Sequence, residues 1–147
     1  MRLTYHTDYA IRTLIYLALN TDKMTTIGDI SHIYGISKNH MMKVVQKLVH
    51  HGYISSERGR NGGIKLLLEP ADIKLGDVIE KMETDLNLVA CFDKNNHGCK
   101  IDGVCQVQGF FSEALNAFLD VMNQYSLEDA VKGRLQLLER LAVVSRE

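Results

Sequence analysis

Apolar and polar positions follow a helical period through the first third of the chain, and this pattern predicts three helices. Residues 8–20 suit an amphipathic helix, residues 26–34 predict a short second helix, and Gly35 supplies the turn that follows it. Ser37 is a good N-cap for a third helix over residues 38–51. The i, i+3, i+4, i+7, i+8 spacing in that helix predicts a buried stripe of Met41, Val44, Val45, Leu48 and Val49.

Strand-like and helical segments follow along the rest of the chain. Residues 53–56 and 64–68 predict two strands around a glycine-rich turn at residues 58–63, and Pro70 marks the exit from this unit. The segments expected after it are a short helix over 75–82, a poorly periodic loop over 84–105, a long helix over 106–125 and a last helix from about 127 to 144. The expected fold is mainly α with a small β-hairpin wing, that is, a winged helix-turn-helix followed by a long dimerisation helix.

The long helix has an apolar face that is broad for a chain of 147 residues. Its stripe consists of Phe111, Leu115, Phe118 and Met122. A small winged domain has little surface with which to cover this stripe, so we expect the helix to hold a homodimer. The chain is therefore divided into a winged helix-turn-helix DNA-binding domain over residues 1–70 and a second part over residues 71–147, which carries a cysteine-bearing loop and the dimerisation helices.

The exposed positions of the third helix carry hydrogen-bond donors suited to DNA. No acidic residue lies between Lys38 and His51, and lysine, asparagine and glutamine have the donors that base edges require. In the turn at residues 58–63, glycines allow close approach to DNA and arginines suit a narrow minor groove. A solvated helix face and an ordinary hairpin turn are the plainer alternatives. The residues expected to bind a palindromic double-stranded operator are Lys38, Asn39, His40, Lys43, Gln46, Arg58, Arg60 and Asn61.

The net charge of −1 conceals an asymmetry that supports the DNA hypothesis. Residues 1–66 hold nine basic against four acidic side chains, a balance of +5, whereas residues 67–147 hold eight against fourteen, a balance of −6. Such a division suggests that one surface faces phosphates. No apolar run approaches the length of a membrane span, and the first residues lack the apolar region of a signal peptide. We therefore expect a cytoplasmic protein that does not bind membranes.

Three cysteines, an odd number, fall within fifteen residues at Cys91, Cys99 and Cys105. In a reducing compartment this favours a metal or reactive thiols over disulfides. The spacing lacks the Cys-x2-Cys pairs of most structural zinc sites and the cysteine run of bacterial ferredoxins. Three thiolates also leave a fourth position on a metal to another ligand. His97 is a candidate for this fourth ligand, although the simpler interpretation is that it is an exposed loop histidine that binds no metal. From spacing alone, an iron–sulfur cluster, a zinc ion and three unrelated thiols remain open.

Several segments spread over nearly the whole chain match the pattern of one known group of regulators. These segments are residues 3–4, 7–17, 34–45, 58–64, 73–78, 88–92 and 125–129. In them the chain resembles the iron–sulfur winged-helix transcriptional repressors. The helix start Asn39-His40-Met41 and the Arg-Asn-Gly-Gly sequence in the turn point to the nitric-oxide-sensing branch of that family.

The resemblance implies a homodimer in which Cys91, Cys99 and Cys105 hold an iron–sulfur cluster, [4Fe–4S] in preference to [2Fe–2S]. In the nitric-oxide branch the fourth ligand can be an aspartate from the first helix of the partner subunit, a position that maps onto Asp8. A carboxylate is a weak ligand for iron beside thiolates, so it would leave one iron open to a diatomic gas. The plainer role for Asp8 is to stabilise the helix dipole. This chain has seven residues between its first two cysteines, where the family usually has five.

The expected function is therefore that of a DNA-binding repressor that senses nitric oxide through its cluster and loses operator affinity when the cluster is nitrosylated or lost. One alternative is a related iron–sulfur regulator that senses cluster or iron status or redox stress. Another is a zinc-stabilised DNA-binding module. The sequence has no nucleophile–base pair, phosphate loop or dinucleotide fingerprint, so we do not expect an enzyme.

Overall fold

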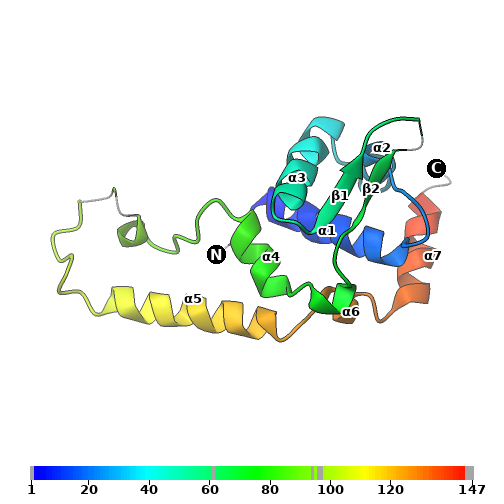
Figure 1. Cartoon of the computed structure of the whole chain (residues 1–147). Helices are drawn as coiled ribbons and strands as arrows, with labels where there is room; N and C mark the ends of the chain where they lie inside the picture. Colours follow the sequence, from blue (N-terminus) through cyan, green and yellow to red (C-terminus); the bar gives the residue numbers. More distant parts are fainter. Residues whose placement is uncertain (1, 61, 94, 96–97, 145–147) are drawn as a thin grey trace.

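A helical body with a small β-hairpin carries one long helix that extends away from it (Figure 1). The computed structural model describes residues 2–60, 62–93, 95 and 98–144. In chain order the elements are α1 (Tyr5–Leu19), α2 (Ile27–Tyr34), α3 (Lys38–His50), β1 (Ile54–Glu57), β2 (Gly63–Leu66), the 3-10 turn η1 (Pro70–Asp72), α4 (Leu75–Met82), the 3-10 turn η2 (Ala90–Phe92), α5 (Val107–Asn123), α6 (Leu127–Ala130) and α7 (Arg134–Val144). The predicted fold class, mainly α with a hairpin wing, is confirmed. None of the described helices is both long and apolar enough to cross a bilayer.

Side-chain caps set where the first two helices begin. The Thr4 hydroxyl accepts from the Thr7 N–H at 3.4 Å, so α1 begins at Tyr5, three residues before its predicted start. Thr26 and Asp29 form a reciprocal capping box at the start of α2, in which each side chain accepts from the other residue's N–H. Gly35, with φ of 62°, ends α2 and allows the turn into α3.

The third helix packs its apolar stripe against α1 and α2. Met41, Val44, Val45 and Leu48 are buried as predicted. Val49 is 38% exposed, so its prediction as a buried residue was wrong. Val49 lies eight residues after Met41, which places it at the edge of the apolar stripe, where its side chain is only partly covered.

Antiparallel pairing of β1 with β2 makes the wing, as predicted. The wing is also fixed to the segment before α2, because Ile64 and Thr25 exchange two backbone hydrogen bonds of 2.8 and 3.1 Å. Across the hairpin the Lys65 ammonium pairs with the Glu57 carboxylate at 3.2 Å. The base of the wing is therefore held at a set position beside the helix-turn-helix.

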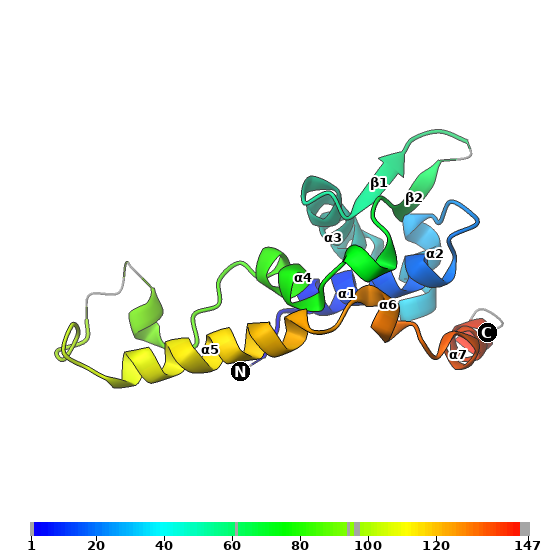
Figure 2. The ribbon, with the colours of Figure 1, turned by 60° about the horizontal axis from the view of Figure 1, so that its bottom comes forward.

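One joint connects α5 to the body. The Asn123 side-chain oxygen accepts from the Asp77 N–H in α4 at 2.9 Å, and the Tyr125 carbonyl accepts from the Leu75 N–H at 3.0 Å. Beyond this joint α5 extends away from the other helices in both views (Figures 1 and 2). No residue of α5 is buried, and Phe110 is 62% exposed. The stripe predicted for dimerisation is therefore only partly covered in the single chain, where Phe111 is 39% exposed and Leu115, Phe118 and Met122 are half-buried.

The last predicted helix is in fact two helices. A turn at residues 131–133 separates α6 from α7, so the prediction of one continuous helix from about 127 to 144 was wrong. Ser126 and Asp129 form a capping box that begins α6, and Lys132 pairs with Asp129 at 2.6 Å. These hydrogen bonds from Lys132 and Ser126 lower the pKa of the Asp129 carboxyl. Gly133, a poor helix former, then follows the short helix.

At the joint between α4 and α5, we expect that a side chain larger than that of glycine is not tolerated at Gly76. A Cβ atom there would overlap the Asn123 side-chain oxygen. We expect Gly76→Ala to lower the free energy of unfolding by about 1–3 kcal/mol, measured by urea denaturation at a fixed protein concentration. Gly28→Ala is the control, because its Cβ would meet the Thr26 hydroxyl at an ordinary 3.5 Å. Equal unfolding midpoints for the two variants would contradict the claim that a Cβ atom at Gly76 disturbs the contact with Asn123.

Candidate nucleic-acid interface and cysteine segment

The exposed face of α3 and the wing border a single groove. Its lining includes Asn39, Met42, Lys43 and Gln46 from α3, together with Ser56 and Arg58 from the hairpin. The structure therefore brings four of the predicted DNA-binding residues into one place, although the hairpin follows α3 in sequence by several residues. Ser56 was not among the predicted DNA-binding residues, since a serine in a short strand does not by itself indicate a contact with DNA.

The remaining predicted DNA-binding residues surround this groove. Lys38 and His40 are exposed in the first turn of α3, and Lys38 also lines a hollow at the base of the wing. Arg60 is exposed at the wing tip. Asn61 lies outside the described residues.

The cations of this surface are available to an anionic partner. In the part of the chain that the structure describes, no carboxylate forms an ion pair with Lys38, Lys43 or Arg58. Lys47, further along α3, is engaged differently, because its ammonium donates to the Met82 carbonyl at 2.9 Å. That contact ties α3 to the end of α4. The groove thus combines unpaired positive charge with amide and hydroxyl groups, which suits phosphates and base edges.

The three cysteines lie on the segment that connects α4 to α5. Cys91 is half-buried in η2, where its carbonyl accepts from the Gln108 side chain at 3.0 Å. Cys99 is exposed, and Cys105 is half-buried shortly before α5. All three are free thiols. His97, the other candidate ligand of this segment, lies outside the described residues.

The described part of one chain does not gather these cysteines into a metal site. Among the described residues, no three His, Cys, Asp or Glu side chains lie together in a way that could hold a metal ion. The chemistry of the donors nevertheless fits an iron–sulfur cluster, because three free thiols, one exposed and two half-buried, occupy one segment.

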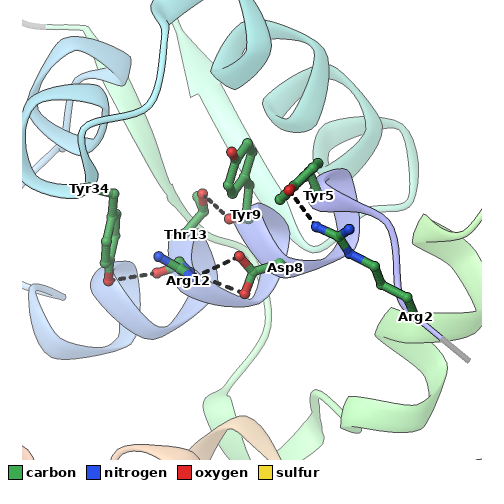
Figure 3. A network of polar contacts seen from close by, with 7 residues as sticks. All are labelled: Arg2, Tyr5, Asp8, Tyr9, Arg12, Thr13 and Tyr34. Atoms are coloured by element: carbon green, nitrogen blue, oxygen red, sulfur yellow. Dashed lines mark hydrogen bonds and ion pairs between the residues drawn. The ribbon is translucent and has the colours of Figure 1, made fainter.

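Asp8, the candidate fourth ligand, lies on α1 in a network of polar contacts (Figure 3). Both of its carboxylate oxygens are held by Arg12, at 3.1 Å from Nε and 2.8 Å from Nη2. The Arg12 guanidinium also lies 5.9 Å from the centre of the Tyr34 ring, whose hydroxyl donates to the Arg12 carbonyl at 3.2 Å. Burial raises the pKa of Tyr34, so this hydroxyl stays protonated as a donor. Asp8 is 44% exposed and open to exchange of its partner.

Sequence reasoning missed a contact that joins the cysteine segment to the start of α1. Glu83, the first residue after α4, accepts from the Thr4 N–H at 2.8 Å and from the Thr4 hydroxyl at 3.2 Å. The two residues are far apart in sequence, and no short motif indicates their contact. A cavity of about 440 Å³ beside them is lined in part by Leu3, Leu88, Phe111 and Phe118.

Comparisons with known proteins agree with this geometry. A family model described as Rrf2, an iron-dependent transcriptional regulator, matches residues 3–133. The HTH-type transcriptional regulator NsrR of Bacillus subtilis (strain 168) is 44% identical over 142 residues, which cover 96% of this chain and 97% of that protein. NsrR of Bacillus licheniformis is 45% identical over 135 residues, covering 91% of this chain and 94% of that protein.

Solved structures share the fold at lower identity. T. potens IscR superposes with a TM-score of 0.72 at 21% identity, over 90% of this chain and 88% of that one. CymR, the global cysteine regulator of B. subtilis, superposes with a TM-score of 0.69 at 22% identity, over 88% of this chain and 95% of that one. These likenesses support the arrangement of winged body and extended α5.

Proposed function

The chain belongs to the Rrf2 family of transcriptional regulators, and we propose that it is a repressor that releases its operator in response to nitric oxide. Its relatives are named as transcriptional regulators, and the chain is a DNA-binding regulator and not an enzyme. We propose that residues 1–70 bind the operator, that residues 71–147 hold a cluster and the dimer together, and that the protein acts in the cytoplasm.

The observation that carries this proposal is the groove between α3 and the wing. Lys43 and Arg58 bring unpaired positive charge to it, and Asn39 and Gln46 bring amides that bond base edges. We propose that each protomer places this groove on one half of a palindromic operator. The stripe of α5, none of which is buried in the single chain, supports a homodimer. A two-fold pair would place two grooves in a symmetric arrangement that matches a palindrome.

We propose that Cys91, Cys99 and Cys105 hold the cluster, [4Fe–4S] in preference to [2Fe–2S]. When bound, such a cluster supplies iron that reacts with nitric oxide. For the partner subunit's cysteines, Asp8 would be a fourth ligand once its carboxylate leaves Arg12. Since α1 packs against α3, ligation by Asp8 would link the cysteine segment of one protomer to the recognition helix of the other. Loss of that link would let the two α3 helices sample separations that no longer match the operator.

The proposal is tested by a visible absorption spectrum of anaerobically purified protein, titrated with nitric oxide while operator binding is followed. A brown protein that loses operator affinity as nitric oxide is added is expected. A colourless protein that binds zinc would favour the zinc-stabilised module. A brown protein whose binding ignores nitric oxide but follows iron supply or oxidants would favour the other iron–sulfur regulators.

Substitutions of two cations should identify the phosphate contacts. We expect Lys43→Ala in α3 and Arg60→Ala in the wing each to weaken operator binding, and to reduce the slope of log K against log salt concentration by about one per protomer. Both side chains are exposed, so the fold should survive. Lys74→Ala, at an exposed lysine just before α4, is the control. Unchanged affinity and slope in either variant would remove that residue from the interface.

Asp8→Ala tests the proposed fourth ligand. We expect the variant to retain a cluster on its three thiols, while its operator binding responds to nitric oxide at an altered concentration, because the partner's segment loses its contact with α1. Asp22→Ala, an exposed acid in the turn after α1, should respond like the unmodified protein. A nitric oxide response of Asp8→Ala identical to that of Asp22→Ala would leave Asp8 as no more than the ion-pair partner of Arg12.

A further inference from the structure

We infer that Met42 determines part of the operator's sequence by contacting the 5-methyl group of a thymine. The inference rests on the proposed function, since it assumes that α3 enters the major groove. Met42 is 44% exposed in the second turn of α3. Isolated apolar side chains are common on protein surfaces, so exposure alone says little. The argument for a thymine contact comes from the residues that lie beside Met42 in the groove.

Met42 lies between two amides on the groove-facing side of α3. Asn39 precedes it by three residues and Gln46 follows it by four, and all three line the groove with the wing. Residues at these spacings are neighbours on one helix face. Asparagine and glutamine bond the N6 and N7 atoms of adenine in the major groove. The thymine paired with such an adenine presents its C5-methyl in the same groove, so one run of A·T pairs offers partners to both amides and to the methionine.

The charge of the groove indicates DNA rather than an apolar protein segment as its occupant. Lys43 and Arg58 contribute positive charge, and the described lining includes no acidic residue. A polyanion with small apolar spots complements such a surface, and a thymine methyl in the major groove is such a spot. Methionine suits this contact, because its unbranched side chain adapts its position and has no strong hydrogen-bonding group to leave unsatisfied.

The test removes the methyl group and the methionine separately. Duplexes are first selected from a random pool by the full-length, cluster-loaded protein. Each thymine of the selected duplex is then replaced by deoxyuridine, which lacks only the 5-methyl group. Operator affinity is measured for the unmodified protein and for Met42→Ala, Met42→Leu and Val49→Ala. Val49 is the matched control, because it is also exposed and apolar on α3 and lines the same groove.

We expect one deoxyuridine position to weaken binding of the unmodified protein by about fourfold, the equivalent of one buried methyl group. At that position Met42→Ala should bind both duplexes equally, whereas Met42→Leu and Val49→Ala should still discriminate. The inference is overturned if no thymine position matters to the unmodified protein, or if Met42→Ala discriminates as well as the unmodified protein does. In either case the duplex would still be bound and the proposed function would stand. Failure to select any duplex would overturn both.

Discussion

Cys99→Ala is expected to abolish both the cluster and tight operator binding. Cys99 is exposed and free in the structure, so its loss should leave the winged body folded. The reason for the expected effect is that only three thiols serve the proposed cluster, and without it the partner's Asp8 has nothing to ligate. Coupling between two sites of a protein typically changes affinity by about 5- to 150-fold, and we expect a loss of operator affinity in this range.

The measurement is an operator titration beside a visible spectrum, both under anaerobic conditions. Val104→Ala is a matched control, because Val104 lies in the same segment, is 79% exposed and is not a proposed ligand. It should retain colour and affinity. If colourless Cys99→Ala bound the operator as tightly as the brown protein, the proposed switch would be wrong and the cysteines would have another purpose.

Phe118→Glu is expected to turn the proposed dimer into a monomer and to weaken operator binding by roughly 10²–10⁴-fold, because the two half-sites would no longer be bound as one unit. Phe118 lies on the apolar stripe of α5, which has no buried residue in the single chain. A carboxylate on that stripe would have to be buried without a partner when two chains associate, which is strongly unfavourable.

Sedimentation at micromolar protein concentration measures the association state, and an operator titration measures the affinity. Asn116→Glu adds the same charge to an exposed position on the other side of α5 and should remain dimeric. A dimeric Phe118→Glu would show that α5 does not hold the interface, whatever its affinity for DNA.

Local patterns were sufficient to predict most of the fold. The observed bounds of α4, Leu75–Met82, are the predicted ones, because the helical spacing of apolar residues is confined to this stretch. The start of α1 was missed, since the cap at Thr4 lies ahead of the first apolar positions of the pattern. The division between α6 and α7 was missed because a period of apolar residues continues through Gly133 while the backbone does not. These errors concern helix ends, where a few hydrogen bonds outweigh periodicity.

For the candidate site, the sequence predicted only those features that are determined within a single helix or strand. The exposure of Asn39, Lys43 and Gln46 follows from the helical period of α3 alone. The pairing of Thr25 with Ile64, which ties the wing to the segment before α2, is indicated by no local pattern. The same holds for the contact between Thr4 and Glu83. Under the proposed function, the way in which the three cysteines come together depends on a bound cluster and a second chain, and a helical or strand period describes neither.

The partly covered state of α5 has a consequence for how this protein is made and kept in the cell. Most of the stability of a helix in a protein comes from packing of its apolar face, and α5, although it contacts α4, buries none of its residues within its own chain. In the proposed homodimer, the packing of α5 would therefore be completed only when two chains associate. A newly synthesised chain without a partner would expose aromatic residues on a fraying helix, which is what chaperones and proteases recognise. Surplus monomer would be degraded while paired chains persist, so the amount of working repressor would depend on the rate at which chains meet as well as on the rate at which they are made.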